Sequence, residues 1–403
     1  MTEGLFAYEK QALRKTQEEM MTFWTGKRFV EAVALVLIFG VLLFSGYRMW
    51  SETRDDRVQE VSGIVLSVDN SEILRGGAGA LGIQRVWVMI ASGALKGHEV
   101  EAINHLNGQL EMDEIYVTGD TILLAIQVDD GAPIQARTIN IYRQNWELAL
   151  FALFASALLI YAGVIGLKAL FSFLGALGLL WYFYIPNLLS GVSPLPLSLS
   201  VLVLLSMVII LSVAGFTRQG VAAFLGTIVG LTVTLILTLF FGQGLKLSGM
   251  TSPFSTTLLV QGAYGLNFSH IFYSAVLLGA SGAAMDIAMD VSASMNEIKE
   301  KRPDIGAREL IRSGMTIGRM VIGTMSTTLL LAYSGGYLTM LMLFVSQGTS
   351  FTRIVNLKLV AAEIFRILIG SIGLVIVAPV TAVIAGVFLT LYGEESRDSC
   401  IEI

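Results

Sequence analysis

The chain of 403 residues is 54% hydrophobic and only 14% charged, whereas an ordinary soluble domain carries about 25% charged residues. This composition is typical of an integral membrane protein, so the first partner that we expect is the lipid bilayer. A net charge of −5 supplies no basic field for nucleic-acid binding. The single cysteine, Cys400, excludes an intrachain disulfide, and the three histidines share no ligand spacing, so we expect no metal and no cofactor.

The N-terminal region predicts a membrane anchor. Residues 1–28 are polar and basic, which indicates a cytoplasmic segment, and an apolar run follows them. That run predicts a first transmembrane helix over 29–50, with Tyr47 and Trp50 as interface anchors. A cleaved signal peptide is the alternative, but the N-terminal arm is long and no small-residue cleavage pattern follows the run. We therefore predict an uncleaved signal anchor.

Residues 51–146 have the composition of a soluble domain. Runs of alternating apolar and polar residues are separated by turns rich in Gly, Asn and Asp; these runs are VSGIVLSV, RVWVMIA, HEVEAIN, TILLAIQV and TINIYR. Such a pattern predicts a small antiparallel barrel or sandwich, and we favour an OB-like barrel on the extracytoplasmic side. Its acidic residues lack the ligand spacing of a calcium loop, so they predict a solvated surface.

Residues 147–392 contain seven further apolar segments, so the fold class is an α-helical multispan membrane protein with about eight transmembrane helices. We place them near 148–166, 168–185, 196–215, 220–241, 268–292, 315–341 and 360–392. The last segment is longer than a straight span needs, so it is tilted, kinked at Pro379 or preceded by an interfacial turn. The loop 242–267 is either a partly re-entrant lid or an ordinary ordered loop.

Lys and Arg residues predict the orientation of these segments. They gather in the loops that eight spans place on the side of the N-terminus, above all between 299 and 312. Both ends of the chain, including the acidic tail 393–403, are therefore predicted to be cytoplasmic.

Two carboxylates in the apolar segment 268–292 are the main functional signal. Asp286 and Asp290 are four residues apart and share one helical face, which Asn296 and Glu297 continue toward the cytoplasm. The small residues of GASGAAM precede them and favour an interior face. An acid inside hydrocarbon is costly and indicates a proton or cation relay. In the alternative interpretation, Asp286 only pairs with a neighbouring side chain and Asp290 is solvated at the headgroup level.

The next apolar segment supplies the other predicted members of the relay. Arg319 is expected to pair with Asp286 or Asp290, because a buried charge without a partner is disfavoured. Three hydroxyls of the motif GTMSTT, those of Thr324, Thr327 and Thr328, can pass protons or coordinate a cation. Simple hydrogen bonding between helices is their alternative role.

The last apolar segment contains a possible ion pair. Glu363 and Arg366 are three residues apart, so they can pair on one helical face. Such a pair is a gate or a structural ion pair, and snorkelling of both side chains to the interface is the alternative.

No enzymatic motif is present. The sequence has no P-loop and no His-Glu-x-x-His pattern, and its glycine-rich RGGAGALG lies in the β-rich region without the strand-to-helix context of a nucleotide site. We therefore expect that the protein is not an enzyme.

Several motifs occur in a specific order along the chain. The β-rich region contains VDNSEI, SGALKGHEVEAINHL and TGD, and the apolar region contains FTRQGVAAFLGTIVG, GASGAAMDIAMDVSASMNEI, SGMTIGR, GTMSTTLLLAYSGG and EIFRILIGSIGLVIVAP. With these motifs the chain resembles the YibE/F family, which implies a bacterial plasma-membrane protein. The positions that the resemblance carries over are Asp286, Asn296, Glu297, Gly318, Arg319, Gly323, Thr324, Glu363 and Arg366. The chain departs from the family pattern at Met320 and Thr327 and has an additional acid, Asp290.

Together these features predict a proton- or cation-coupled permease of an unknown small substrate, with Asp286 as the principal ion site. The alternative is a membrane scaffold that transports nothing and recruits protein partners through its β-rich domain and basic loop.

Overall fold

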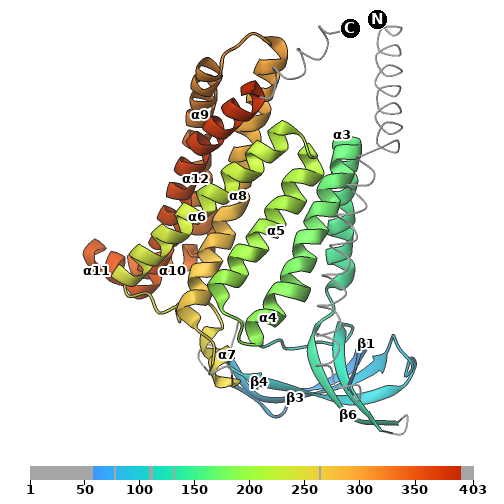
Figure 1. Ribbon diagram of the computed structural model, residues 1–403. Coiled ribbons are helices and arrows are strands. Elements are labelled where there is room, and N and C mark those ends of the chain that lie inside the picture. The colour runs from blue at the N-terminus through green and yellow to red at the C-terminus, as the bar shows by residue number, and fades with distance from the viewer. Residues whose placement is uncertain (1–57, 77–78, 109–111, 130–131, 263–264, 392–403) are drawn as a thin grey trace, which may run out of the picture. The chain divides into compact units, whose positions relative to one another are not determined.

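The computed structural model describes residues 58–391, except 77–78, 109–111, 130–131 and 263–264. The predicted anchor at 29–50 and the predicted cytoplasmic segments 1–28 and 393–403 lie outside the described residues. The chain divides into two compact units, one containing a β-barrel and the other most of the helices, with the boundary between Tyr161 and Ala162 (Figure 1).

The first unit contains a closed barrel. Strands β1, β5, β6, β4 and β3 pair in this order, and β1 also pairs with β3, which closes the ring. The β4–β6 pairing is parallel and the other pairings are antiparallel. The strands are β1 (Val58–Asp69), β2 (Ile73–Gly76), β3 (Gly79–Ile90), β4 (Glu99–Asn107), β5 (Thr121–Asp129) and β6 (Ala132–Ile141). The predicted small barrel is thus confirmed, but its β4–β6 pairing is parallel where an antiparallel barrel was expected, and the short β2, which pairs with β3 alone, was not predicted.

The barrel interior follows the alternation of the sequence. On β3, Val86 and Val88 are buried while Trp87 between them is exposed, as a half-buried strand requires. Gln84 is a polar exception that is fully buried. Its side-chain amide donates to the Tyr116 carbonyl at 2.8 Å and its oxygen accepts from the Tyr116 N–H at 3.0 Å. These bonds fix the segment before β5 against the barrel, because a buried amide without partners is costly.

Six helical segments of the described chain are long and apolar enough to cross a membrane. The helices are α3 (Gln144–Gly178), η1 (Leu179–Tyr184), α4 (Ile185–Leu189), α5 (Pro194–Ala214), α6 (Arg218–Gly244), α7 (Ser255–Val260), α8 (Phe268–Lys301), α9 (Ala307–Gly336), α10 (Leu338–Ser346), α11 (Phe351–Asn356) and α12 (Lys358–Leu391).

The predicted spans 148–166 and 168–185 fall in one helical run, Gln144–Leu189. A straight helix of this length would extend about 69 Å, more than twice the roughly 30 Å of a bilayer's hydrocarbon. The run is interrupted at Gly163, whose φ of 52° and ψ of −123° are not helical and suit a residue without a Cβ. The seven predicted segments therefore correspond to six candidates, and the number of transmembrane helices stays a prediction.

Other element boundaries also differ from the expected ones. The segment predicted at 315–341 forms α9, which begins at Ala307 and ends at Gly336. The short α11 precedes α12, and Pro379 lies inside α12 without interrupting it; whether α11 is the expected interfacial turn stays a prediction. The loop 242–267 contains the short α7, and its placement in or outside a membrane stays a prediction.

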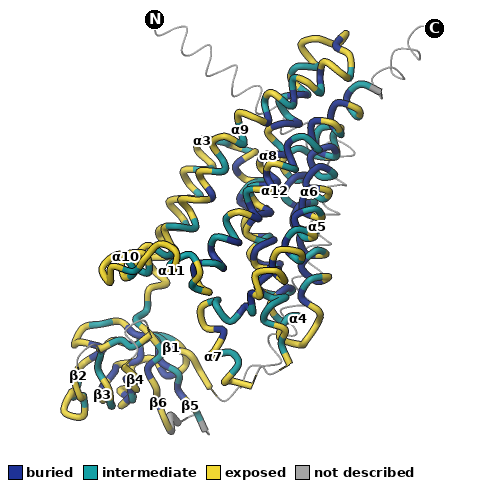
Figure 2. The backbone as a smooth tube through the Cα atoms, turned by 90° about the vertical axis from the view of Figure 1, so that its left-hand side faces the viewer, coloured by how far each residue is buried: buried dark blue, intermediate teal, exposed yellow. Residues whose placement is uncertain are grey.

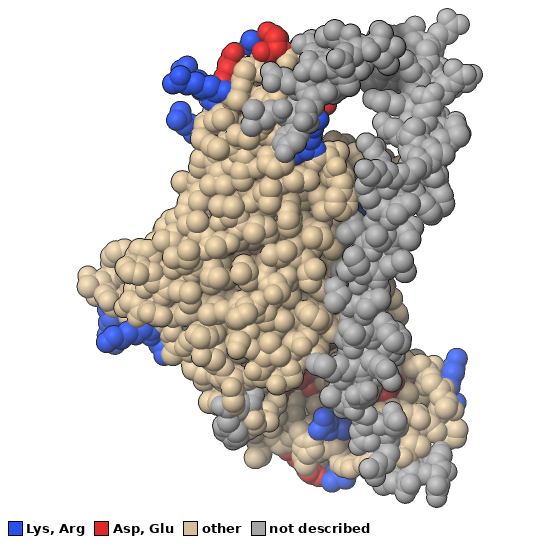
Figure 3. All heavy atoms as spheres, viewed as in Figure 1, with Lys and Arg blue, Asp and Glu red and all other residues tan. Residues whose placement is uncertain are grey.

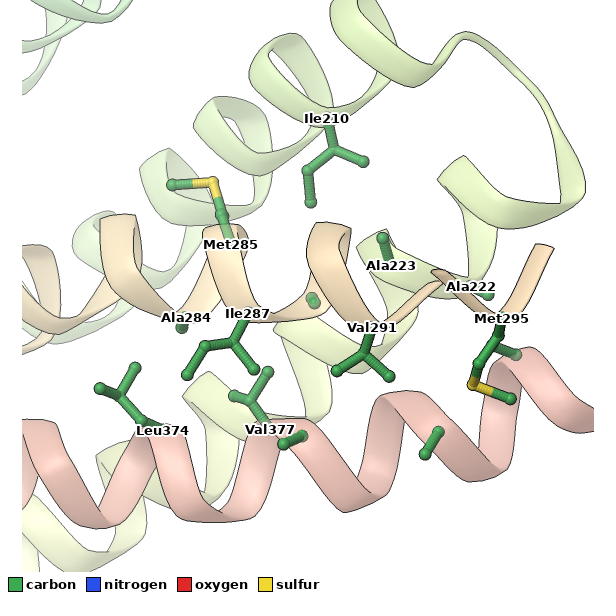
Figure 4. Close-up of a cluster of buried hydrophobic side chains, with 14 of the residues drawn as sticks. Ile210, Ala222, Ala223, Ala284, Met285, Ile287, Val291, Met295, Leu374 and Val377 are labelled. Carbon is green, nitrogen blue, oxygen red and sulfur yellow. The ribbon is translucent and has the colours of Figure 1, made fainter. Parts of the chain in front are cut away.

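Helix α8 is the centre of the helical unit. It packs against α5, α6, α9 and α12, which themselves pack in the order α5, α6, α12, α9. Figure 4 shows Ile287 and Val291 of α8 pointing toward Leu374 and Val377 of α12, while Met285 points to the opposite side. The four neighbours therefore form an arc around α8, with α5 at one end and α9 at the other.

Glycines allow α6 and α12 to approach closely. Gly226 and Gly230 of α6 lie directly against Thr381 and Val377 of α12, and a Cβ built on either glycine would overlap these side chains. Gly373 of α12 lies against Thr234 of α6 in the same way. Small residues at such a contact increase van der Waals packing between helices, which is a main source of helix association in lipid.

We expect Gly230→Ala to destabilise the protein, because the added methyl group overlaps Val377. Overpacking of this kind costs about 1–3 kcal/mol, which exceeds the gain in helix propensity from Ala. The measurement is the thermal unfolding temperature of the purified protein in detergent. Gly244→Ala, at the open end of the same helix, is the control and should leave that temperature unchanged or raise it. Equal effects of the two substitutions would contradict the assigned contact.

Candidate functional site

Both predicted carboxylates lie on the side of α8 that the arc of neighbours leaves open. Exposed residues recur along this side at helical spacing: Ala275, Gly279, Gly282, Asp286 and Asp290. Both acids are exposed on the described chain, and their expected interior position stays a prediction. The small residues before them were expected to bring a neighbouring helix over this face, but of the two glycines on it only Gly279 is contacted by a described residue, through the Tyr333 side chain of α9, whereas Gly282 faces open space.

Contacts between α8 and α9 fix the height of the acids. Gly318 of α9 lies against Val291, Gly314 lies against Met295, and the Tyr333 side chain reaches Gly279. Residue numbers rise along one helix as they fall along the other, so the two helices are antiparallel. Arg319 consequently lies at the height of Asp290, and Thr324 lies at the height of Asp286.

Asp286 lies far from both ends of α8. It is about 27 Å along the axis from Phe268 and about 22 Å from Lys301, at about 1.5 Å per residue. This depth is consistent with a position inside hydrocarbon or at its inner boundary when α8 spans a bilayer.

The predicted pairing of Arg319 with the acids is not formed. Among the described residues, no ion pair connects Arg319 with Asp286 or Asp290, and all three residues are exposed. The charges share a height without forming an ion pair, because a contact also depends on how each helix is rotated about its axis. Arg319 belongs to a broad exposed face of α9, visible in Figure 2.

The hydroxyls of α9 bond to their own helix. Thr324 Oγ1 donates to the Val321 carbonyl at 3.0 Å, and Thr328 Oγ1 donates to the Thr324 carbonyl at 3.2 Å. Thr327 is exposed on the same helix. Neither of these two bonds crosses to α8, so the Thr324 and Thr328 hydroxyls do not link the two helices by hydrogen bonds in this structure.

Asn296 and Glu297 belong to the polar end of α8. Asn296 Nδ2 donates to Glu300 at 2.7 Å, and Glu297 forms an exposed ion pair with Lys301 at 2.7 Å. Asn296 is about 15 Å along the helix axis from Asp286. The structure therefore does not bring these two predicted relay members together with Asp286.

The connection between α8 and α9 is tightly held. Lys299 Nζ donates to the carbonyls of Pro303 and Ile305, at 2.8 and 3.1 Å, and the Ile305 side chain is buried. Arg302 pairs with Glu309 across the turn at 2.9 Å. These contacts set the register of the two helices, and with it the height of Arg319 relative to Asp290.

A second polar site is formed by Glu363 and Arg366 of α12. The predicted pair is confirmed: Arg366 Nη1 lies 3.4 Å from Glu363 Oε1, and the side chains are only 18% and 12% exposed for Arg366 and Glu363, respectively. The guanidinium carbon lies 5.6 Å from the ring centre of Phe272 on α8 and 6.0 Å from that of Tyr333 on α9. The pair is thus enclosed between three helices by cation–π contacts. Its role as a gate or a structural pair stays a prediction.

Sequence reasoning missed the aromatic part of this second site. Phe272 also stacks on Phe365 of α12, with ring centres 5.9 Å apart. These aromatic residues come from segments distant in the sequence, so no local spacing marks their contact. The only available signal was the unusual density of aromatic residues in FSHIFY at the start of α8.

Within the described residues, no group of three His, Cys, Asp or Glu side chains is arranged to hold a metal ion. A cavity of about 300 Å³ lies elsewhere, beside α7 and the start of α8, and Phe254, Leu258 and Phe268 contribute to its lining. Asp286 does not line this cavity, so the acids of α8 form a site on an open helix face and not in this pocket.

We expect Arg366→Met to destabilise the protein strongly, because it leaves the buried Glu363 carboxylate without its partner. Breaking a buried pair from one side costs about 3–5 kcal/mol, whereas the double variant Glu363→Gln, Arg366→Met should recover most of the lost unfolding temperature. The matched control is Glu297→Gln, which breaks the exposed pair with Lys301 and should cost less than about 1 kcal/mol. If the effects of Arg366→Met alone and Glu363→Gln alone simply add up in the double variant, the two side chains are not energetically coupled.

A comparison with protein families identifies the helical part of the chain. The model of the YibE/F-like protein family matches residues 150–391, a range that contains both polar sites and excludes the barrel. No curated protein and no solved structure matches the chain. The match covers more than half of the 403 residues, and the chain therefore belongs to the YibE/F-like protein family.

Proposed function

We propose that this YibE/F-like protein is a multi-pass plasma-membrane permease, with both termini in the cytoplasm, that couples a proton or another cation to the movement of a small substrate. Asp286 is the principal ion site in this proposal, and Asp290 is a second site one helical turn away. One observation carries the proposal: the central helix of the unit has a single open face, and its two mid-helix carboxylates lie on that face.

The placement in a membrane is supported by the six apolar helices. On the face shown in Figure 3, a broad band of the helical unit shows no Lys, Arg, Asp or Glu; charged side chains gather at the end that contains the α8–α9 connection, and a second basic group lies on the lower left edge of the unit. Charged residues cost several kcal/mol inside hydrocarbon, so an uncharged band of this kind suits contact with lipid.

Asp286 and Asp290 are charged residues in an apolar helix, so their cost in hydrocarbon calls for a specific role. A protonated or cation-bound carboxylate carries less net charge than a free one, so occupancy of Asp286 changes the cost of its position. Burial of Ile287, Ala288 and Val291 on the other sides of α8 holds the acids on a rigid support. Proton or cation binding then lowers the net charge of the open face, and this shifts its preference from a polar environment toward an apolar one.

A feature of the barrel favours a second candidate function. Ile64 and Met89 are directly opposite each other on β1 and β3, and both are exposed, as are Leu66 and Trp87 nearby. An exposed apolar group on a sheet suits a protein contact. In this alternative the barrel recruits a protein partner and the helices anchor the scaffold without transporting anything.

The first test measures proton movement in vesicles that contain the purified protein and a trapped pH-sensitive dye. With an imposed pH gradient, we expect faster pH equilibration than in protein-free vesicles, and Asp286→Asn should remove the difference. Asp304→Asn changes an exposed acid in the α8–α9 connection and should retain it. Unchanged proton flux in Asp286→Asn would refute the ion site. Sodium flux is measured in the same way with a trapped sodium-sensitive dye, and the absence of both proton and sodium flux in the wild type would favour the scaffold.

A second measurement of the same site needs no substrate. Dicyclohexylcarbodiimide modifies protonated carboxyl groups in apolar surroundings, and mass spectrometry locates the product. We expect modification of Asp286 in membranes at neutral pH and little of Asp304, with less product as the pH rises, because the ionised carboxylate does not start the reaction. Modification of Asp286 no greater than that of Asp304 at every pH would contradict a protonatable site in hydrocarbon.

A further inference from the structure

We propose that a second copy of this chain covers the open face of α8 and α9, and that Arg319 of each copy pairs with Asp290 of the other. The carboxylate site is then completed only in the dimer, with the Asp286 side chains enclosed between the two copies. This proposal does not depend on transport, because a dimeric scaffold without ion flux would satisfy it equally.

The first argument is the number of unpaired polar groups on this face. Asp286, Asp290 and Arg319 are exposed and have no ion-pair partner among the described residues. Each charge costs about 2.5–3.5 kcal/mol at the centre of a spanning helix. The exposed side of α9 is also polar along much of its length, through Arg312, Thr316, Arg319, Thr324, Thr327 and Thr328. A face of this composition is unsuited to lipid and requires polar contacts.

The second argument comes from glycines against which no side chain of the same chain packs. The space where a Cβ of Gly314 or Gly318 of α9 would lie is occupied by side chains of α8 and α12. In contrast, Gly282 of α8 and Gly323 of α9 have open space where a Cβ would lie. Small residues on a spanning helix favour close approach of another helix. These two glycines therefore indicate that a further helix packs on the open face.

The third argument is symmetry. A two-fold axis along the membrane normal keeps every residue at its own depth, so two residues can meet across it only when they lie at the same height. The contact between Gly318 and Val291 places Arg319 and Asp290 at one height. The opposite charges are thus arranged as a symmetric dimer requires, with one ion pair on each side of the axis.

The predicted anchor at 29–50 is a poorer occupant of this face. Its two charges, Glu31 and Arg48, are 17 residues apart, which is about 26 Å along a helix, so the predicted anchor could not supply both signs of charge at the common height of Arg319 and Asp290. A second copy supplies both signs of charge at the required depth and adds the polar face of its own α9.

Charge reversal tests the proposed ion pairs. The mass of the purified protein is measured by native mass spectrometry and by light scattering in lipid nanodiscs, where each chain contributes 43.6 kDa. We expect the wild type to be dimeric, and Asp290→Arg or Arg319→Asp alone to raise the dissociation constant of the dimer at least about tenfold, equivalent to about 1.4 kcal/mol. The double variant Asp290→Arg, Arg319→Asp should restore the dimer, because both pairs re-form with reversed polarity.

A matched exchange controls for general effects of charge. Glu297→Lys with Lys301→Glu reverses an exposed pair at the polar end of α8 and should leave the dimer intact. Restoration by the double variant also guards against misfolding of the single ones. A monomeric wild type in nanodiscs, or single reversals that remain dimeric, would overturn the proposal. Ion flux by a monomer would overturn the dimer while leaving the proposed permease in place.

Cross-linking identifies the occupant of the face directly. In a Cys400→Ser background, which removes the only cysteine, Gly282→Cys and Thr327→Cys are placed in two differently tagged copies and expressed together. We expect a disulfide-linked product that carries both tags, since these positions lie at the same height. Gly282→Cys with Ile236→Cys, on the exposed side of α6, is the control and should give none. A disulfide within one chain between Gly282→Cys and Val41→Cys would show that the anchor covers the face and would overturn the proposal.

Discussion

Close approach of helices at glycines is the constraint on which the helical unit depends. Lipid removes the hydrophobic advantage of burying Leu or Val between helices, so packing relies on van der Waals contact and interhelical bonds. Gly226 and Gly230 let α6 lie directly on Val377 and Thr381 of α12. The buried threonines of α6 bond back to their own helix, as Thr234 does to the Gly230 carbonyl, whereas the buried Thr381 hydroxyl of α12 in the same contact has no hydrogen-bond partner among the described residues.

This packing determines where the candidate site lies. α6 and α12 together provide the wall against which α8 packs, and Gly314 and Gly318 bring α9 onto the edge of that wall. Once these contacts are made, α8 has one side left, between α9 and α5. The acids lie on this side at a height that the Lys299 contacts in the α8–α9 connection maintain. The position of the site is therefore set by the packing of α6, α9 and α12 against α8, and not by a direct partner, since no described residue forms an ion pair with Asp286.

Local spacing was sufficient to predict some of these features. Alternation of apolar and polar residues located the barrel strands, and spacings of four and three residues correctly grouped Asp286 with Asp290 and Glu363 with Arg366. The interruption at Gly163 was not predictable, because nothing in an apolar run of 46 residues shows which of its glycines has a positive φ.

The partner of a charge was harder to predict than its height. Arg319 was expected beside the acids and does lie at the height of Asp290, but no ion pair connects them. The sequence gives the position of a residue along a helix, whereas the direction of its side chain toward a neighbour depends on how both helices are rotated in the packed unit. The same limit concealed the contacts of Arg366 with Phe272 and Tyr333.

The two charged sites of the helical unit differ in one respect that bears on function. Glu363 and Arg366 meet within one helix and are enclosed by aromatic rings from two others, so their charges are compensated inside the chain. Asp290 and Arg319 have the same chemistry and a common height, yet neither has an ion-pair partner among the described residues. The fold therefore encloses and pairs one set of opposite charges within the chain, although the buried Arg366 Nε has no hydrogen-bond partner among the described residues. The open face of α8 and α9 is therefore best explained as a surface whose charges are satisfied from outside the described chain, by an ion, by a second copy or by both.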